Sequence, residues 1–491
     1  MNLSRRFVRT HLLMLLAVTL VTSWFSYAFF HIDEYFQVLE LTRSKLAPGE
    51  VTGFAWEHTE RLRPWLQPFL YWLVARVLHV HEIFALGFLF RLVTGLANVL
   101  AVALFLRTTL PMQRDEAEAR LHVRVVTLAG FLPYLFVRTS SESASMAAMV
   151  IGWSLLFAGA RPRVTAALAS GFFFGLAFEF RFQTAFFVVG IMAWLFVYGA
   201  RRALVPLSIA GLLAVALGVV IDHWGYGEWT FPAWNYLRAN VIEGAAGMFG
   251  KEPPFAYFWL DASNVFGPIA LALFFVMVVA WVRAPRHPLT WTTLPFFVAH
   301  GLISHKEERF VFPMAIFVLG MVTLAAGNTS PRLARVGAWI LARRKNPLLL
   351  FANFAPMLLL ALYPLGWNHH VRFERAMHER FGDSFTGAVL PEIELNPPPF
   401  HMTDRHLEKM DPETLNRRID DGTAPSFLIA DRPVLSTGFP SLDSHATVVY
   451  SELPGDDALR QKLAGWVDAY NAHAKAPLRR LLYRTLYRIE R

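Results

Sequence analysis

The chain has 491 residues, of which 55% are hydrophobic and only 17% charged, and a formal net charge of +9. Soluble proteins carry roughly 25% charged residues, and many apolar runs here approach the ~20 residues that cross a bilayer, so an ordinary soluble domain is excluded. There is no cysteine, which excludes disulfides and cysteine-ligated zinc, and no Walker lysine motif or dinucleotide fingerprint, which argues against a nucleotide-driven pump.

The apolar runs predict an all-α polytopic membrane protein with about eleven transmembrane helices. In chain order, the expected spans are 11–30, 83–106, 123–137, 144–160, 163–180, 184–200, 203–221, 263–283, 287–304, 310–326 and 348–367.

Basic residues gather in the short loops between these spans, and they fix the expected orientation. With eleven spans, every basic group falls on one side, which the positive-inside rule makes cytoplasmic, as is the N-terminus. The net positive charge therefore sets topology, and no nucleic-acid partner is expected. The residues concerned are Arg5, Arg6, Arg9, Arg107, Arg114, Arg120, Arg124, Arg161, Arg163, Arg201, Arg202, Arg283, Arg286, Arg332, Arg335, Arg343, Arg344 and Lys345.

Residues 65–80 are apolar but short, and they contain Pro68 and Arg76. Counting them as a span would put the arginine clusters on opposite faces. We therefore expect an amphipathic or re-entrant helix at the outer interface. The alternative is an ordinary second span with another segment miscounted.

This topology places the loops 31–82 and 222–262 on the outer face, together with a polar tail after Trp367. We expect residues 1–367 to form the transmembrane domain and 368–491 a small soluble α/β domain. In the tail, helical patterns cover 403–422 and 456–490, and strand-like runs cover 426–429 and 446–450.

The unusual polar clusters all fall on the outer face. Asp33 and Glu34 follow the first span in "HIDEYFQVLE", and "SHKEERF" brings His305, Lys306 and Arg309 within five residues. Ionisable groups at a membrane boundary are costly unless they pair or face water, so they mark candidate functional sites. A carboxylate beside a basic cluster suits a general base next to a bound anion. The alternatives are a solvated helix end and a corner in which Glu307 and Glu308 only neutralise the cations.

Lysine and arginine can hold a phosphate, arginine as a bidentate fork. Arg138 and Arg181 are either further phosphate ligands or residues that snorkel to the interface. Outer-loop tryptophans such as Trp56 and Trp234 fit interfacial anchoring or sugar stacking. No histidine spacing matches a known metal site, so no divalent metal or other cofactor is expected.

In order, "HIDEYFQ", "WEHTERLRPWLQP", "RTSSES", "RFQTA", the aromatic-rich stretch 225–259 and "HKEERFVFP" resemble glycosyltransferase family 22, the alpha-mannosyltransferases of glycosylphosphatidylinositol and N-glycan assembly. The resemblance spans about residues 31 to 313, and the C-terminal tail matches weakly. The family start reads His-Pro-Asp-Glu, whereas Ile32 replaces the proline here. The compact, cysteine-free chain favours a bacterial member.

The resemblance implies a GT-C fold with its active site on the periplasmic or lumenal face of the bacterial inner membrane or endoplasmic reticulum. It implies an inverting transferase that moves a sugar, foremost mannose, from a polyprenyl-phosphate donor to a glycan or glycolipid as an alpha-glycoside. Asp33 would be the base, and Glu34 would support it. The donor phosphate would be held by His305, Lys306, Arg309, Arg181 and Arg138. The sugars would be bound by His31, Gln37, Trp56, Glu57, Tyr226 and Trp234.

Other functions remain open at this stage. A GT-C transferase for another sugar, with lipid A or protein as acceptor, also carries an early acidic pair, although the "HKEERF" corner argues against it. A lipid or solute transporter would show charges at mid-span and repeated, broken halves, and a scaffold without activity is a further alternative. The acceptor, donor lipid, linkage and oligomeric state are not encoded in any readable motif.

Overall fold

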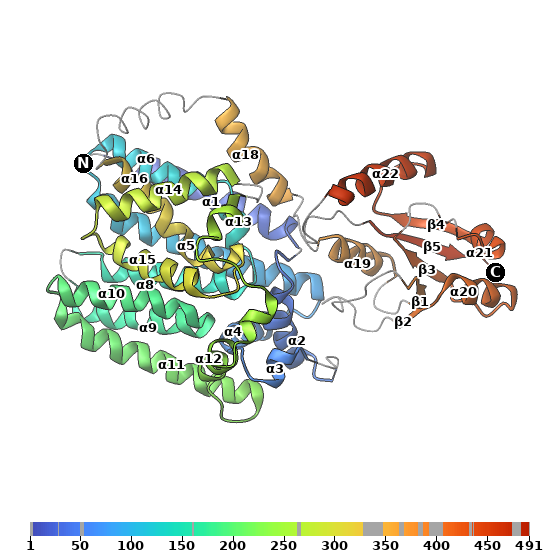
Figure 1. Cartoon of the computed structure of the whole chain (residues 1–491), viewed down its shortest axis with the longest axis horizontal. Helices are drawn as coiled ribbons and strands as arrows, with labels where there is room; N and C mark the ends of the chain where they lie inside the picture. The colour runs from blue at the N-terminus through green and yellow to red at the C-terminus, as the bar shows by residue number, and fades with distance from the viewer. Residues whose placement is uncertain are drawn as a thin grey trace. The chain divides into compact units, whose positions relative to one another are not determined.

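The computed structural model describes residues 3–27, 29–49, 54–159, 162–262, 267–327, 347–362, 368–381, 386–391, 406–431, 435, 437–473 and 483–490 (Figure 1). The chain divides into two compact units. The first comprises Met1–Ser26, Phe36–His81 and Leu86–Tyr363. The second comprises Tyr27–Tyr35, Glu82–Ala85 and Pro364–Arg491.

The first unit is helical. Its main helices are α1 (Arg5–Phe25), α5 (Ile83–Thr109), α6 (Glu116–Leu128), α7 (Leu132–Phe136), α8 (Ser141–Leu156), α9 (Val164–Phe180), α10 (Ala185–Val197), α11 (Leu204–Tyr226), α14 (Gly267–Arg283), α15 (Pro288–Leu302), α16 (Ala315–Gly327) and α18 (Pro347–Leu362). Shorter segments are a π-helix (Tyr35–Leu39), α2 (Glu40–Leu46), α3 (Trp56–Thr59), α4 (Leu66–Val77), α12 (Pro232–Leu237), a second π-helix (Arg238–Ile242), α13 (Tyr257–Ala262) and 3₁₀ turns at Leu110–Met112, Phe182–Thr184, Arg201–Ala203, Ala245–Phe249 and Glu308–Met314.

Within the described residues, four helical stretches are long and apolar enough to cross a membrane: Arg5–Phe25, Ile83–Met112, Arg201–Tyr226 and Glu308–Ala325. Each of the eleven predicted ranges contains helix where the structure describes it. The range 123–137 is divided into α6 and α7 because Ala129 leaves the helical conformation shortly before Pro133. The predicted positions 263–266 and 363–367, and the basic loop 332–345, lie outside the described residues. The total of eleven spans stays a prediction.

Helices α9 and α11 approach each other closely through glycines. Gly171 and Gly175 form a G-x-x-x-G pair, and a Cβ on Gly171 would lie 2.1 Å from the carbonyl oxygen of Leu207. Small residues with this spacing let the backbones of membrane helices approach one another. This contact fixes the relative position of the two helix ends that carry Arg181 and Tyr226.

Residues 66–77 form α4, a helix of 12 residues. Tyr71 and Ala75 are buried on one face, whereas Leu70, Leu73 and Val77 are exposed on the other. A helix of this length is too short to cross a bilayer upright. The prediction of an amphipathic helix is consistent with this geometry, and its place at the outer interface stays a prediction.

The second unit contains a five-stranded sheet in the order β2-β1-β3-β5-β4. Its strands are β1 (Thr386–Val389), β2 (His406–Lys409), β3 (Phe427–Ala430), β4 (Ala446–Ser451) and β5 (Thr485–Ile489). Strand β1 is parallel to β2 and β3, whereas β5 is antiparallel to β3 and β4. The helices are α19 (Asn368–Phe381), α20 (Pro412–Asp420), α21 (Pro440–His445) and α22 (Asp457–His473).

Helices cover both faces of this sheet. Phe373 and Met377 of α19 pack with Val389 and Ile429 on one face. Leu415 of α20 and Leu442 of α21 pack with Ala388 and Leu428 on the other. The described part of the C-terminal region is thus an α/β structure.

Two predicted helices in the tail were too long. In the described part of the range 403–422, strand β2 occupies His406–Lys409. The helix begins only at Pro412, after Asp411 caps it by accepting from the Thr414 N–H at 2.9 Å. The range 456–490 ends in strand β5, whose Thr485–Ile489 run pairs with both β3 and β4. Sheet pairing, which no local pattern encodes, overrides helical propensity in both places.

Candidate active site

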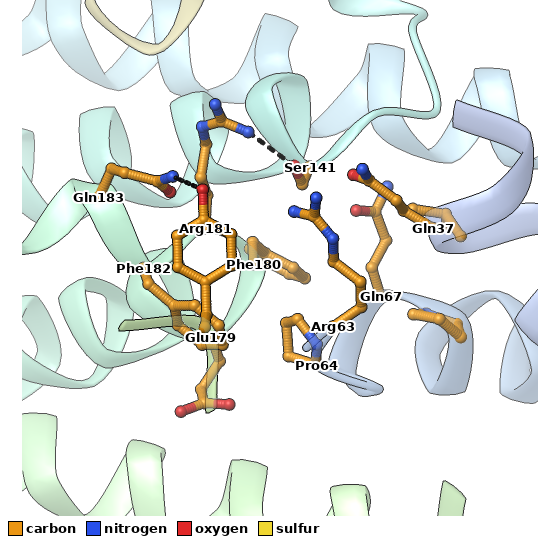
Figure 2. Close-up of a pocket in the computed structure, with 13 residues that line it drawn as sticks. Gln37, Arg63, Pro64, Gln67, Ser141, Glu179, Phe180, Arg181, Phe182 and Gln183 are labelled. Carbon is orange, nitrogen blue, oxygen red and sulfur yellow. Dashed lines mark hydrogen bonds between the residues drawn. The ribbon is translucent and has the colours of Figure 1, made fainter. Parts of the chain in front are cut away.

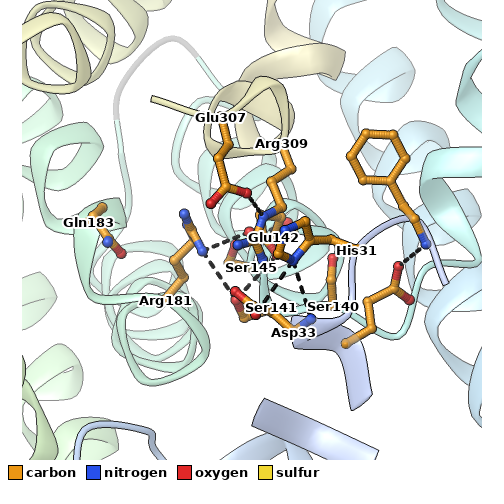
Figure 3. A network of polar contacts seen from close by, with 12 residues as sticks. His31, Asp33, Ser140, Ser141, Glu142, Ser145, Arg181, Gln183, Glu307 and Arg309 are labelled. Carbon is orange, nitrogen blue, oxygen red and sulfur yellow. Dashed lines mark hydrogen bonds and ion pairs between the residues drawn. The ribbon is translucent and has the colours of Figure 1, made fainter. Parts of the chain in front are cut away.

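A buried cluster of ion pairs joins three elements of the first unit. Glu142 lies in the first turn of α8, Arg181 directly follows α9, and Arg309 lies in the 3₁₀ turn before α16. Glu142 Oε1 lies 2.8 Å from Arg181 Nη1 and 3.5 Å from Arg309 Nη1. Arg309 Nε also lies 2.5 Å from Glu307 Oε2. Figure 3 shows Glu142 between the two arginines, with Glu307 beside Arg309.

This cluster concentrates charge where water is scarce. The side chains of Glu142, Arg181 and Arg309 are 1%, 4% and 6% exposed. Burying a guanidinium without a partner costs several kcal/mol. Glu142 supplies a counter-charge to both arginines, and Glu307 supplies a second one to Arg309. The face of Phe310 covers both guanidinium groups, with its centroid 5.0 Å from Arg181 and 5.3 Å from Arg309.

A pocket that is partly open to solvent adjoins the cluster through Arg181 (Figure 2). Polar groups from distant parts of the chain converge on it, which is typical of a ligand site. Two guanidinium groups and several amides make the lining suitable for an anionic or hydroxyl-rich ligand. The lining residues are Gln37, Val38, Arg63, Pro64, Gln67, Pro68, Ser141, Glu179, Phe180, Arg181, Phe182, Gln183 and Tyr236.

Three buried polar atoms of the pocket residues lack a hydrogen-bond partner within the described part of the chain: Arg181 Nε, Gln67 Oε1 and Glu179 Oε1. The amide nitrogen of Gln67 donates to the Thr139 carbonyl at 3.0 Å and to the Tyr71 hydroxyl at 3.1 Å. Buried polar groups are normally satisfied. One donor, Arg181 Nε, and two acceptors, Gln67 Oε1 and Glu179 Oε1, are therefore available to a ligand here.

The predicted phosphate ligands fall into two groups. Arg181 and Arg309 meet around Glu142, and His305 lies beside them in the chain with Nε2 3.0 Å from Glu307 Oε1. Arg138 instead donates to the backbone oxygen and hydroxyl of Ser26, at 2.8 and 2.5 Å, and holds the end of α1.

Lys306 is directed to backbone oxygens. Its Nζ donates to the carbonyls of Glu252 at 3.1 Å and Ile303 at 2.5 Å, which fixes the corner before the 3₁₀ turn. Burial lowers the pKa of the Lys306 ammonium from its usual value, and Glu252 partly offsets this. The structure thus gives Arg138 and Lys306 structural partners.

The predicted catalytic carboxylates lie in the second unit. Asp33 Oδ1 is 3.4 Å from His31 Nδ1, and both side chains are about one quarter exposed. Glu34 is buried, and its Oε1 accepts from the Phe30 N–H at 2.8 Å, as a helix-capping group does. Asp33 opens the helical run whose next turn carries Gln37, one of the pocket residues.

The predicted sugar-binding residues also fall into different surroundings. Gln37 lines the pocket, whereas Trp56 and Trp234 are exposed. Glu57 pairs with Arg63 (Nε to Oε2, 2.9 Å), and Tyr226 donates its hydroxyl to the Arg63 carbonyl at 2.7 Å.

The sequence reasoning missed five residues that build the site: Glu142, Arg63, Gln67, Gln183 and Tyr236. All of them lie in the polar stretches already singled out. The sequence feature that could have identified them is a charged or amide residue close to a predicted site residue, as Gln183 is close to Arg181. Among the described residues, no three His, Cys, Asp or Glu side chains converge on a possible metal position.

A family model described as the Alg9-like mannosyltransferase family matches residues 10–370. The chain is 24% identical over 340 residues to GPI alpha-1,2-mannosyltransferase 3 of Bos taurus, covering 67% of this chain and 59% of the relative. It is 28% identical over 330 residues to GPI mannosyltransferase 3 of Yarrowia lipolytica, covering 64% and 61%. It is 31% identical over 149 residues to GPI alpha-1,2-mannosyltransferase 3 of Danio rerio, covering 30% of this chain and 26% of the relative. The chain thus spans less than two thirds of the length of these relatives.

Among solved structures, the chain is similar to ArnT from Cupriavidus metallidurans bound to undecaprenyl phosphate, with a TM-score of 0.49 and 14% identity over 91% of this chain and 97% of that one. It is also similar to the Archaeoglobus fulgidus oligosaccharyltransferase in complex with zinc and sulfate, with a TM-score of 0.48 and 13% identity, covering 92% and 70%.

Proposed function

This chain belongs to the Alg9-like mannosyltransferase family, and we propose that it transfers mannose from a polyprenyl-phosphate donor to a glycan or glycolipid acceptor, forming an alpha-glycoside. The observation that carries this proposal is the pair of buried arginines, Arg181 and Arg309, gathered around Glu142 beside a polar pocket. A lipid-phosphate donor also fits a sequence without a nucleotide-binding motif.

The arginines supply what the leaving group of this reaction needs. As the bond from the mannose C1 to the phosphate oxygen breaks, negative charge grows on the phosphate. Fixed cations in a site with little water stabilise such charge strongly. Arg181 Nε, which has no hydrogen-bond partner within the described residues, is a donor for a phosphate oxygen. Arg309 adds a second guanidinium, and His305 lies at the same corner of the chain.

Inversion requires one base opposite the leaving phosphate. In the proposed step, Asp33 takes the proton of the acceptor hydroxyl while the acceptor oxygen bonds to C1 and polyprenyl phosphate departs. The support for Asp33 is its family resemblance and its place at the start of the helical run that leads to Gln37. Glu34, whose carboxylate caps the backbone at Phe30, supports the conformation of that run. Arg138 and Lys306 support the site by holding backbone.

The proposal extends to the setting of the reaction. The protein is an integral membrane protein with a GT-C fold, and its active site faces the periplasm or lumen. The N-terminus is cytoplasmic. Transfer requires no divalent metal.

The test uses purified protein in detergent with a synthetic short-chain polyprenyl-phosphate [3H]mannose and a lipid extract from the host as acceptor. Wild type is compared with Asp33→Asn, each with and without EDTA. The proposal expects labelled product from wild type in both conditions, and a loss of at least 100-fold in Asp33→Asn.

Each other outcome overturns a named part. Loss of wild-type activity in EDTA would overturn the metal-free reaction. Full activity in Asp33→Asn would overturn the base and point to Glu34. The remaining outcome is that wild type is inactive with extracts from several hosts and with donors of other sugars as well as mannose. That result would overturn the transferase and favour transport.

A further inference from the structure

The segment 61–65 is tied to the end of helix α11 and to α12 by hydrogen bonds that the proposed reaction does not use. The Trp65 N–H donates to Asp222 Oδ1 at 2.7 Å, and the Tyr226 hydroxyl donates to the Arg63 carbonyl at 2.7 Å. Asn235 of α12 donates to the Arg61 carbonyl at 3.3 Å. Backbone groups of Arg61, Arg63 and Trp65 are thus each held by a hydrogen bond with a distant side chain.

Packing makes this attachment rigid. Trp65 is fully buried, and its indole lies against Gly225, where an added Cβ would come within 2.1 Å of the ring. The rings of Trp224 and Tyr226 meet it edge-on at 5.9 and 5.7 Å. Side chains on both sides of Trp65 therefore project from a fixed backbone.

Two of those side chains, Arg63 and Gln67, line the pocket (Figure 2). Glu57 binds the Arg63 guanidinium along one edge, with Nε to Oε2 at 2.9 Å, and the ring of Tyr236 lies 5.4 Å from its centre. Gln183 in turn donates to the Tyr236 hydroxyl at 2.8 Å. Arg63 keeps an intermediate exposure of 19%, unlike the buried Arg181.

The two side chains offer complementary chemistry. Arg63 can only donate hydrogen bonds, whereas Gln67 Oε1 is a buried acceptor without a partner within the described residues. The assignment of this oxygen is fixed because the other amide atom faces carbonyl oxygens and must be nitrogen. A hydroxyl both accepts and donates. A donor and an acceptor placed on either side of the fixed residue Trp65 therefore match two neighbouring hydroxyls of a sugar ring.

Resting on the proposed function, we propose that Arg63 and Gln67 form a subsite that binds a vicinal pair of pyranose hydroxyls, with Glu57 and Tyr226 as positioning residues. Arg63 donates to one hydroxyl, and the other donates to Gln67 Oε1. The subsite lies in the same pocket as Arg181, which is assigned to the phosphate. The sugar recognised belongs to either the donor or the acceptor, and kinetics distinguishes the two.

The test measures KM and kcat for donor and acceptor separately in wild type, Arg63→Lys, Gln67→Met and Tyr226→Phe. The matched control is Arg61→Lys, because Arg61 lies in the same segment but is half-exposed, pairs with Glu228 and does not line the pocket. Thermal unfolding of each variant checks that it is folded.

We expect Arg63→Lys and Gln67→Met each to raise one KM about tenfold, with kcat within threefold of wild type. The KM that rises should belong to the same substrate in both variants. Tyr226→Phe should raise that same KM by about threefold, because it loosens Arg63 without removing it. Arg61→Lys should change neither constant. The substrate whose KM rises carries the recognised hydroxyls.

Unchanged KM values for both substrates in folded Arg63→Lys and Gln67→Met would overturn the subsite and leave the transferase standing. An equal fall of kcat in every variant, without a change in KM, would assign these residues a purely structural role. Absence of transfer by wild type would overturn the proposed function, and this inference with it. A substrate analogue that lacks one of the two hydroxyls should bind more weakly than the substrate to wild type. In the variant whose substituted residue binds that hydroxyl, the analogue and the substrate should bind equally well.

Discussion

At the scale of single residues, the site depends on how buried charges are paired. Two guanidinium groups, Arg181 and Arg309, share Glu142 at 2.8 and 3.5 Å. A buried ion pair adds little net stability, but removing one partner leaves the other charge without compensation in a poor solvent. Glu142 is therefore the residue whose loss should disturb both arginines at once.

We predict that Glu142→Gln lowers the free energy of unfolding by about 3 kcal/mol, measured by thermal or chemical denaturation in detergent. The matched control is Glu116→Gln, which breaks an exposed i,i+4 pair with Arg120 and should cost less than about 1 kcal/mol. Equal effects of the two substitutions would contradict the assignment of Glu142 as an essential counter-charge.

A second residue-scale prediction concerns Glu40 in α2. Burial raises its pKa from 4.5 to about 7, and the Ala55 N–H offsets only part of this. A raised pKa means that the folded state holds the proton more tightly than the unfolded chain. The stability that this provides is complete below about pH 4.5 and is lost as the pH rises through 7, a change of about 3 kcal/mol.

Glu40→Gln should therefore remove this pH dependence. Relative to wild type, the variant should gain stability between pH 5 and pH 8, as measured by melting temperature. Glu60→Gln, which changes an exposed carboxylate in the same loop, should follow the wild-type curve. Parallel curves for Glu40→Gln and wild type would show that Glu40 is not buried as described.

The residue scale also shows what sequence reasoning can find. The "HKEERF" and "RFQTA" stretches pointed to Arg309 and Arg181, and the structure places their guanidinium groups around one carboxylate. Glu142, Arg63 and Gln67 were missed because their roles depend on partners far away in the chain. The backbone partners of Arg138 and Lys306 at Ser26, Glu252 and Ile303 are set only by the fold, and a role of these two residues in phosphate binding stays a prediction.

At the scale of elements, the contact between α9 and α11 positions both walls of the pocket. Arg181 follows α9, and α11 ends in Asp222 and Tyr226, which hold the segment of Arg63. The helices meet at Gly171, where backbone atoms of Leu207 leave no space for a side chain. Any separation of the two helices must therefore move Arg181 relative to Arg63.

We predict that Gly171→Ala destabilises the protein by about 2 kcal/mol and lowers kcat/KM for mannosyl transfer. An added Cβ would lie 2.1 Å from the Leu207 carbonyl oxygen, and backbone cannot yield as a side chain can. In the same interface, a Cβ on Gly211 would lie 3.3 Å from the Gly171 oxygen, so Gly211→Ala should have a much smaller effect. A larger effect of Gly211→Ala would contradict the described contact.

The elements of the membrane unit were easier to predict than those of the tail. Long apolar runs such as 83–106 and 203–221 form helices because a helix satisfies its own backbone in lipid. Strands β2 and β5 were missed because a strand of four or five residues depends on distant partners. Asp411 followed by Pro412 was a local signal that the helix begins there rather than at 403.

At the scale of the whole molecule, the topology can be tested because the chain has no cysteine. Helix α11 has 23 residues and links Arg202, in the preceding turn, to Glu228 just beyond its end. At 1.5 Å per residue it is about 34 Å long, enough to cross the ~30 Å hydrocarbon core. Both of these flanking residues are exposed.

We predict that, in spheroplasts, a membrane-impermeant maleimide labels Glu228→Cys but not Arg202→Cys, and that permeabilisation exposes Arg202→Cys. This pattern follows from the positive-inside rule applied to the arginine-rich loops. Labelling of Arg202→Cys alone in intact spheroplasts would invert the proposed topology and place the pocket on the cytoplasmic side.

The most direct test of inverting mannosyl transfer is the anomeric configuration of the product. Wild-type protein would be incubated with a β-linked polyprenyl-phosphate [3H]mannose and the acceptor extract, and the labelled product digested with α-mannosidase or β-mannosidase. Inversion at C1 predicts complete release of the label by α-mannosidase and none by β-mannosidase. Release by β-mannosidase alone would contradict a single displacement at C1 with one base opposite the phosphate that Arg181 and Arg309 are proposed to hold.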